Sequence, residues 1–177
     1  MFSSVVFALA VAVCSGQLPE GRPQSSVPTV DERRVAVLNR LRDEINGRYG
    51  YRDGAPRINL GPCGRFAKAF TEHWNTRFTQ KIHIVFVMAN DDSQCWHVLL
   101  KLPDGNYYDG GNGVISERTL LVLFPKSRID EMTKLDLELL DQRSYGLNRN
   151  YPLCPNYSDE TTRSLIERYL ATLPADS

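Results

Sequence analysis

The 177-residue chain has no long apolar run and no excess of charge of either sign. Its longest apolar stretch, residues 5–13, is about half as long as the roughly 18 residues that a membrane span requires. Lysine and arginine (21) equal aspartate and glutamate (21), so the basic composition typical of nucleic-acid-binding proteins is missing. Glycine (12) and proline (10) are too few for a collagenous or low-complexity chain. These absences indicate a globular protein, and we expect a monomer with no membrane span and no nucleic-acid partner.

The first 16 residues differ from the rest because they are mostly apolar and contain no charged side chain. This pattern is typical of a secretory signal peptide, with an N-terminal core helix as the alternative. Residues 17–30 carry three prolines and no apolar cluster, which predicts a flexible lead-in. The expected organisation is therefore a signal peptide (1–16), a lead-in (17–30) and one domain (31–177) of a secreted, extracellular protein.

Within that domain the hydrophobic period changes from helical to strand-like and back, which predicts an α+β fold. A tight-turn signature at residues 103–106 joins two of the strands. Residues 132–139 fit either a strand or a helix. The expected helices cover residues 31–46, 63–78, 116–124 and 158–173, and the expected strands cover 82–88, 96–102 and a third run that opens at Tyr107.

A cysteine opens the second predicted helix, in the sequence Gly61-Pro62-Cys63-Gly64. The free amides and the dipole of a helix N-terminus favour the thiolate form of a cysteine, which is the form that attacks. Gly64 leaves room for a substrate backbone, and the amide of Cys63 can donate a hydrogen bond to an oxyanion. The pattern predicts Cys63 as a nucleophile, and a small buried apolar cysteine is the alternative.

A nucleophilic cysteine needs a base, and the chain has three histidines. His73 lies about 15 Å along the helix from Cys63, and His83 shares a strand face with valines, whereas His97 begins a strand whose rim can face the helix start. Asp109 follows across the next tight turn, so pairing of the two strands should bring it close to His97. An aspartate in that place fixes the imidazole tautomer. The sequence predicts the triad Cys63, His97 and Asp109, with a satisfied strand histidine and a turn aspartate as the alternatives.

Charge is unevenly distributed although the total is zero. Residues 48–82 contain seven basic and two acidic side chains. This excess favours attraction of an anionic polymer, and a solvated surface is the alternative.

The order of these motifs resembles a known family. A loop tyrosine (Tyr51), a cysteine that opens a helix, a strand histidine and a polar residue about twelve positions later resemble the NlpC/P60-type papain-like peptidases and amidases of bacterial peptidoglycan. More narrowly, four segments are similar to the second family of type VI secretion amidase effectors and their horizontally acquired arthropod relatives; these are residues 47–52, 62–67, 97–98 and 102–111.

The resemblance implies a papain-like fold, in which a catalytic cysteine at a helix N-terminus packs against an antiparallel sheet that carries His97 and Asp109. It implies an antibacterial cysteine hydrolase that cuts peptide stems or cross-links of bacterial peptidoglycan, the bond between D-alanine and the diamino acid being favoured. Tyr51 and Gly64 are then expected to bind substrate or the oxyanion. The chain departs from the family around Cys63, where NlpC-type proteins have Asp-Cys-Ser-Gly, and in having Asp as the third residue.

Two other functions fit the same residues. A transglutaminase-like enzyme acting on protein or peptide substrates has Cys, His and Asp in the same order, and a catalytically inactive wall-binding module would keep the same fold. The sequence contains no HExxH, CxxC pair, GxGxxG or P-loop motif. We therefore expect neither a metal nor another cofactor.

Export would expose the cysteines to an oxidising compartment. Cys14 leaves with the signal peptide, so Cys63, Cys95 and Cys154 remain. Because a bridge to Cys63 would destroy the nucleophile, the sequence predicts a Cys95–Cys154 disulfide, with two buried free thiols as the alternative.

Overall fold

A computed structural model describes residues 30–144, 146–147 and 149–175 of the chain. The predicted signal peptide lies outside the described residues, as does the predicted lead-in up to residue 29. The elements in chain order are α1 (Val30–Tyr49), β1 (Tyr51–Arg52), β2 (Ala55–Pro56), the 3-10 helix η1 (Arg57–Asn59), α2 (Cys63–Arg77), β3 (His83–Ala89), β4 (Cys95–Lys101), β5 (Tyr107–Asp109), β6 (Gly113–Ile115), α3 (Glu117–Leu123), β7 (Ser127–Met132), α4 (Leu137–Arg143) and α5 (Asp159–Leu170).

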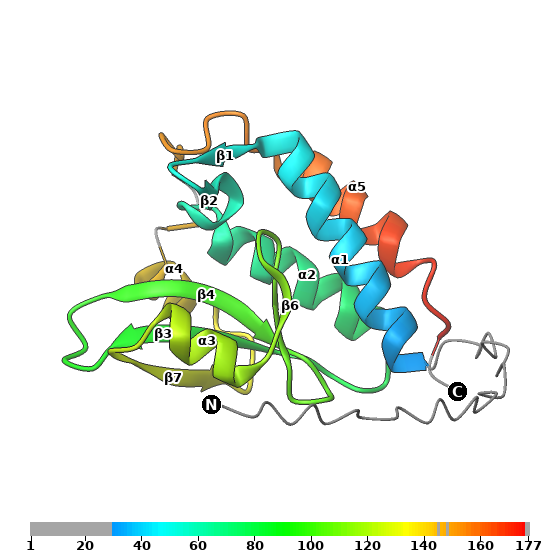
Figure 1. Cartoon of the computed structure of the whole chain (residues 1–177), viewed down its shortest axis with the longest axis horizontal. Helices are drawn as coiled ribbons and strands as arrows, with labels where there is room; N and C mark the ends of the chain where they lie inside the picture. The colour runs from blue at the N-terminus through cyan, green and yellow to red at the C-terminus, as the bar shows by residue number, and fades with distance from the viewer. Residues whose placement is uncertain (1–29, 145, 148, 176–177) are drawn as a thin grey trace, which may run out of the picture.

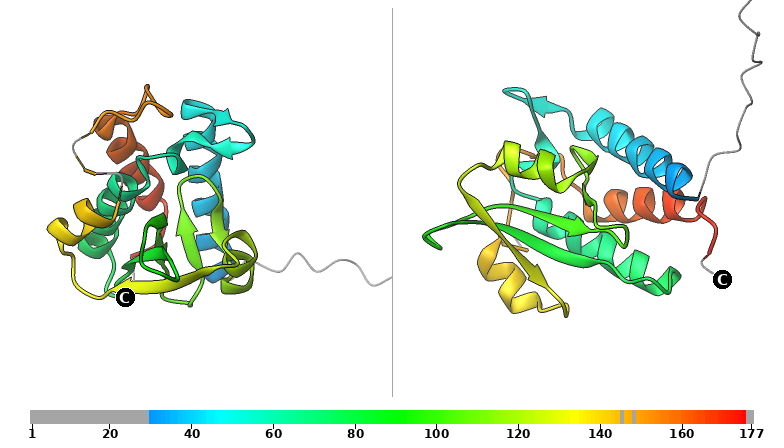
Figure 2. Two further views of the ribbon diagram at one scale, coloured as in Figure 1. Left: turned by 90° about the vertical axis from the view of Figure 1, so that its left-hand side faces the viewer. Right: turned by 60° about the horizontal axis from the view of Figure 1, so that its bottom comes forward.

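The predicted α+β fold class is confirmed. Five strands form an antiparallel sheet in the order β6-β5-β4-β3-β7. Figure 1 shows α2 between this sheet and an outer layer of α1 and α5. Helix α3 covers the opposite face of the sheet, where Leu120 packs against Val85 and Leu99. Both views of Figure 2 keep α1 and α5 side by side, and the start of α1 lies beside the end of α5. None of the helices in the described part of the chain is both long and apolar enough to cross a membrane.

Helix α2 is the centre of the main core because its apolar side chains recur every four residues. Phe66, Phe70 and Trp74 are buried, and successive ring centroids lie 5.8 Å apart. Tyr108 of β5 packs against Phe70 at 5.0 Å between ring centroids. These contacts fix α2, and with it Cys63 at its first position, against the sheet.

The five-stranded sheet differs from the prediction in two places. The third predicted run is a pair of short strands, β5 and β6, and a strand that the sequence did not indicate, β7, pairs with β3. The segment 132–139, which fitted either a strand or a helix, contains the end of one and the start of the other. Strand β7 ends at Met132 and helix α4 begins at Leu137.

Candidate active site

Cys63 is the first residue of α2 and is 9% exposed. The chain reaches it through Gly61, whose φ of 132° is one that residues with a side chain rarely adopt. A Cβ at Gly61 would also lie 2.8 Å from the ring of Tyr151. The turn at Gly61 therefore places the thiol at the helix N-terminus, where the first backbone amides have no intrahelical acceptor.

His97 and Asp109 lie on adjacent strands and are both buried. In the β4–β5 ladder Leu100 pairs with Tyr108, so His97 and Asp109 are diagonal neighbours at the rim of the sheet. His97 Nε2 and Asp109 Oδ2 are 3.0 Å apart. The structure thus brings these two predicted residues into direct contact.

Burial alone would lower the pKa of His97, but hydrogen bonds with Asp109 and Cys63 outweigh it and raise that pKa to about 10. Because Nε2 of His97 faces Asp109, Nδ1 is the ring nitrogen available to the Cys63 thiol. A protonated imidazole in this position is suited to stabilise a thiolate and to deliver a proton to a leaving group. The ring is covered on one side by Phe124, at 5.9 Å between ring centroids.

Asp109 accepts hydrogen bonds at both carboxylate oxygens from groups that sequence reasoning missed. Oδ1 accepts from Asn59 Nδ2 (3.0 Å) and from the amides of Gly111 (2.8 Å) and Asn112 (2.6 Å). Oδ2 accepts from Asn112 Nδ2 (2.9 Å) as well as from His97.

Burial would raise the pKa of Asp109, but its bonds to His97 and Asn112 lower it to about 2. The carboxylate is therefore ionised and held in one orientation. Asn112 was detectable as a residue three positions after an aspartate in a turn, whereas Asn59 had no local signal.

Cys63 and His97 open onto a cleft of about 440 Å³. Four separate parts of the chain form its walls: the 59–61 turn, the start of β4, the end of α4 and residues 152–153. Its lining residues are Asn59, Leu60, Gly61, Cys63, Ser93, Gln94, Cys95, Trp96, His97, Val98, Gln142, Arg143, Ser144, Pro152 and Leu153. The thiol of Cys63 therefore lies in the wall of this cleft.

Neither of the two predicted substrate-binding residues, Tyr51 and Gly64, lines this cleft. Tyr51 pairs with Pro56 in a short hairpin, and its side chain is 56% exposed. Gly64 is buried beneath Ser144, since a Cβ on Gly64 would lie 2.7 Å from Ser144 Oγ. In this structure the space beside Gly64 is therefore occupied by the end of α4.

The other histidines are placed away from this cleft. His83 Nε2 lies 4.0 Å from a carboxylate oxygen of Glu131 on β7. His73 lines a different cavity together with Thr76 and Leu170.

Cys63, Cys95 and Cys154 are all free thiols in the structure, so the predicted Cys95–Cys154 bridge is not formed. Their surroundings differ. Burial and, to a smaller extent, the nearby Cys63 raise the pKa of Cys95 to about 11. Burial also raises the pKa of Cys154, and the charge of Arg57 opposes that rise. Cys95 lies in the cleft beside the candidate nucleophile, and its Sγ donates to the carbonyl of His97 at 3.2 Å.

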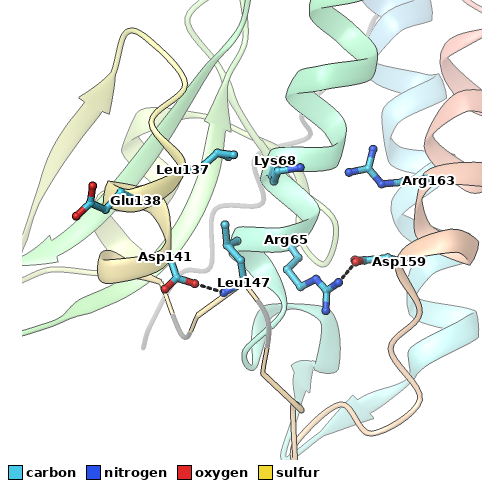
Figure 3. A pocket seen from close by; sticks show the side chains of 8 residues that line it. All are labelled: Arg65, Lys68, Leu137, Glu138, Asp141, Leu147, Asp159 and Arg163. Carbon is cyan, nitrogen blue, oxygen red and sulfur yellow. Dashed lines mark hydrogen bonds and ion pairs between the residues drawn. The ribbon is translucent and has the colours of Figure 1, made fainter.

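A second cavity of about 440 Å³ lies between α2, α4 and α5 (Figure 3). Two residues of the basic stretch, Arg65 and Lys68, line it. Figure 3 shows Arg65 directed at Asp159, with which it forms an ion pair, and Lys68 pairs with Glu72 at 2.7 Å. These two cations are balanced by carboxylates of the same chain, so the part of the basic stretch that lines this cavity is not uniformly positive.

Among the described residues, no group of three or more His, Cys, Asp or Glu side chains is arranged to hold a metal ion. Comparison of the chain with protein-family models, with curated proteins and with solved structures finds no match.

Proposed function

We propose that this protein is a secreted, antibacterial cysteine hydrolase of bacterial peptidoglycan, with a papain-like arrangement of the NlpC/P60 type. The observation that carries the proposal is the buried chain of Cys63, His97 and Asp109, which opens onto a cleft at the N-terminus of α2. A histidine held between a thiol and an ionised aspartate is the arrangement that activates a cysteine nucleophile.

The proposed reaction begins with attack of the Cys63 thiolate on the carbonyl carbon of a peptide bond. The amides at the start of α2 are oriented to stabilise the oxyanion that forms. His97 donates its proton to the leaving nitrogen as the C–N bond breaks, and a thioester to Cys63 remains. Neutral His97 then takes a proton from water, whose oxygen attacks the thioester and releases a carboxylic acid.

The substrate class comes from the resemblance of the motifs around Cys63, His97 and Asp109 to peptidoglycan amidases. Peptide stems and cross-links of the bacterial wall are the proposed substrates, with the bond between D-alanine and the diamino acid as the preferred target. The polar side chains along the cleft, among them Gln94, Gln142 and Arg143, fit a peptide that carries amides and carboxylates.

Release of soluble fragments from purified walls tests the proposal. The wild-type chain should release muropeptides with new amino and carboxyl termini, and Cys63→Ala should release none while keeping the wild-type circular dichroism spectrum. Cys154→Ala is the matched control, because it removes a cysteine that does not line the cleft, and it should retain turnover.

The same experiment separates the alternatives. Transfer of a labelled primary amine onto a peptide, without new termini, would indicate a transglutaminase-like enzyme. Cys63-independent binding to walls without any fragments would indicate an inactive binding module. Turnover by Cys63→Ala at the wild-type rate would contradict the proposed nucleophile.

A further inference from the structure

An apolar groove of about 240 Å³ lies next to the candidate active site, between the start of β4 and the segment that follows α3. Its lining residues are Trp96, Leu123, Phe124, Pro125, Lys126 and Ser127. The Trp96 side chain is 53% exposed, which is unusual for the largest apolar side chain in a protein. An exposed aromatic surface in a groove is typical of a ligand-binding site.

Two contacts make this groove continuous with the catalytic cleft. Trp96 lines both cavities and therefore lies at the boundary between them. Phe124 forms part of the groove and stacks on the imidazole of His97, with an angle of 20° between the rings. A ligand that fills the cleft and extends past Trp96 therefore enters the groove.

The position of Trp96 depends on a β-bulge. Val87 pairs with His97 and Met88 pairs with Cys95, so Trp96 has no partner on β3. Cys95 packs toward the main core, and the indole stays outside it. Bulges next to active sites commonly redirect a side chain in this way.

We infer that the groove beside Trp96 binds an amino sugar of the glycan strand to which the substrate peptide is attached. The inference rests on the proposed function, since it concerns the same substrate. One face of a pyranose ring carries only C–H groups and stacks on an indole, and the volume of the groove fits a single N-acetylated sugar. Lys126 and Ser127 supply polar groups for the hydroxyl and acetamido substituents.

The peptide part of the polymer fits this groove less well than the sugar. The residues on either side of the proposed scissile bond, alanine and a diamino acid, have small or charged side chains, and neither has a broad apolar face. A lipid surface is the other occupant that exposed apolar residues suggest, because α3 also exposes Leu121 and Val122. Continuity with the cleft through Trp96 and Phe124 favours the sugar.

Intrinsic fluorescence offers a binding test that does not depend on catalysis. The chain has two tryptophans, and Trp74 is fully buried, so a change on adding ligand reports Trp96. Peptide-free glycan strands and N-acetylated chitotetraose are titrated into the Cys63→Ala protein. We expect a saturable fluorescence change. Trp96→Ala lacks the reporting indole, so its binding is measured in a pull-down with wall fragments, from the amount of protein retained. It should bind the strands about tenfold more weakly, which corresponds to about 1.4 kcal/mol. Trp96→Phe, which keeps a ring, should lose less.

Kinetics supply the second test. With muropeptides that carry the disaccharide, Trp96→Ala should raise KM about tenfold with little change in kcat. With the same peptide freed of its sugar, Trp96→Ala should raise KM by a much smaller factor, because only the contact of Trp96 with the cleft is then lost. Val122→Ala is the matched control, because it removes an exposed apolar side chain of α3 that does not line the groove.

Absence of glycan binding by the Cys63→Ala protein would overturn the inference, as would an equal rise in KM with and without the sugar. A fluorescence change with anionic phospholipid vesicles that Val122→Ala abolishes, and none with glycan, would assign the groove to a lipid surface instead. If the wild type cleaves neither substrate, the proposed function fails, while the glycan titration still decides whether the groove binds sugar.

Discussion

Replacing Gly64 with alanine tests how closely the end of α4 is held against the first turn of α2. The new Cβ would lie 2.7 Å from both Cβ and Oγ of Ser144, a distance at which one of the two helices has to move. Overpacking of this kind costs about 1–3 kcal/mol. Alanine in place of glycine in a helix recovers up to about 1 kcal/mol of that cost. We expect Gly64→Ala to lower the free energy of unfolding by roughly 1–2 kcal/mol, and the melting temperature by roughly 2–8 °C.

A double-mutant cycle isolates the contact. Ser144→Gly removes both clashing atoms, and the next neighbour of the new Cβ is then Leu140 Cδ1, at an ordinary distance of 3.8 Å. In that background Gly64→Ala should be neutral or stabilising, because only the gain in helix propensity remains. The four proteins are compared by thermal denaturation followed by circular dichroism. An equal cost of Gly64→Ala with and without Ser144 would refute this account of the packing, as would a stabilising effect in the wild-type background.

Three further predictions follow from the site. Asp109→Asn should lower kcat by up to roughly 10⁴-fold. Folding lowers the pKa of Asp109 from 3.8 to about 2, so the ionised carboxylate stabilises the wild type relative to Asp109→Asn. This difference in stability should be at its maximum above about pH 4 and should disappear as the pH falls through 2, in melting curves recorded across that range. Asn112→Ala removes the 2.9 Å bond to Oδ2 and should lower kcat about tenfold with KM unchanged in steady-state kinetics. Alkylation after unfolding without reductant should label Cys63, Cys95 and Cys154, and recovery of a linked Cys95–Cys154 peptide would show a bridge instead.

The parts of the fold that sequence reasoning predicted depend on local patterns. The helix that opens at Cys63 follows from the apolar spacing of Phe66, Phe70 and Trp74, and the order of helices and strands follows from changes of period. The closeness of His97 and Asp109 follows from the register across one tight turn, although the ladder makes them diagonal rather than opposite neighbours. Each of these inferences needs only residues that are close in the sequence.

The parts that could not be predicted depend on contacts between distant segments. Asn59 reaches Asp109 across 50 positions, and the end of α4 forms one wall of the cleft. Tyr51 is expected at the site through the family resemblance alone, whereas Asp53 and Gly54 both have positive φ and close a tight hairpin turn beside it. Spacing along the chain carries no information about that change of direction.

The bulge at Trp96 determines two positions in the proposed binding surface, that of His97 in the cleft and that of Trp96 in the groove. Regular alternation would direct Trp96 toward the same face as Val98, which is buried in the main core. An extra residue in β4 breaks that alternation, so Cys95 packs toward the core and the indole stays at the mouth of the cleft. His97, the next residue, re-enters the ladder opposite Val87 and keeps its contact with Asp109. The position of the proposed base and that of the proposed sugar platform are therefore coupled through the backbone. A deletion or insertion in residues 93–96 should disturb both, whereas Trp96→Ala should weaken sugar binding and leave the contact of His97 with Asp109 in place.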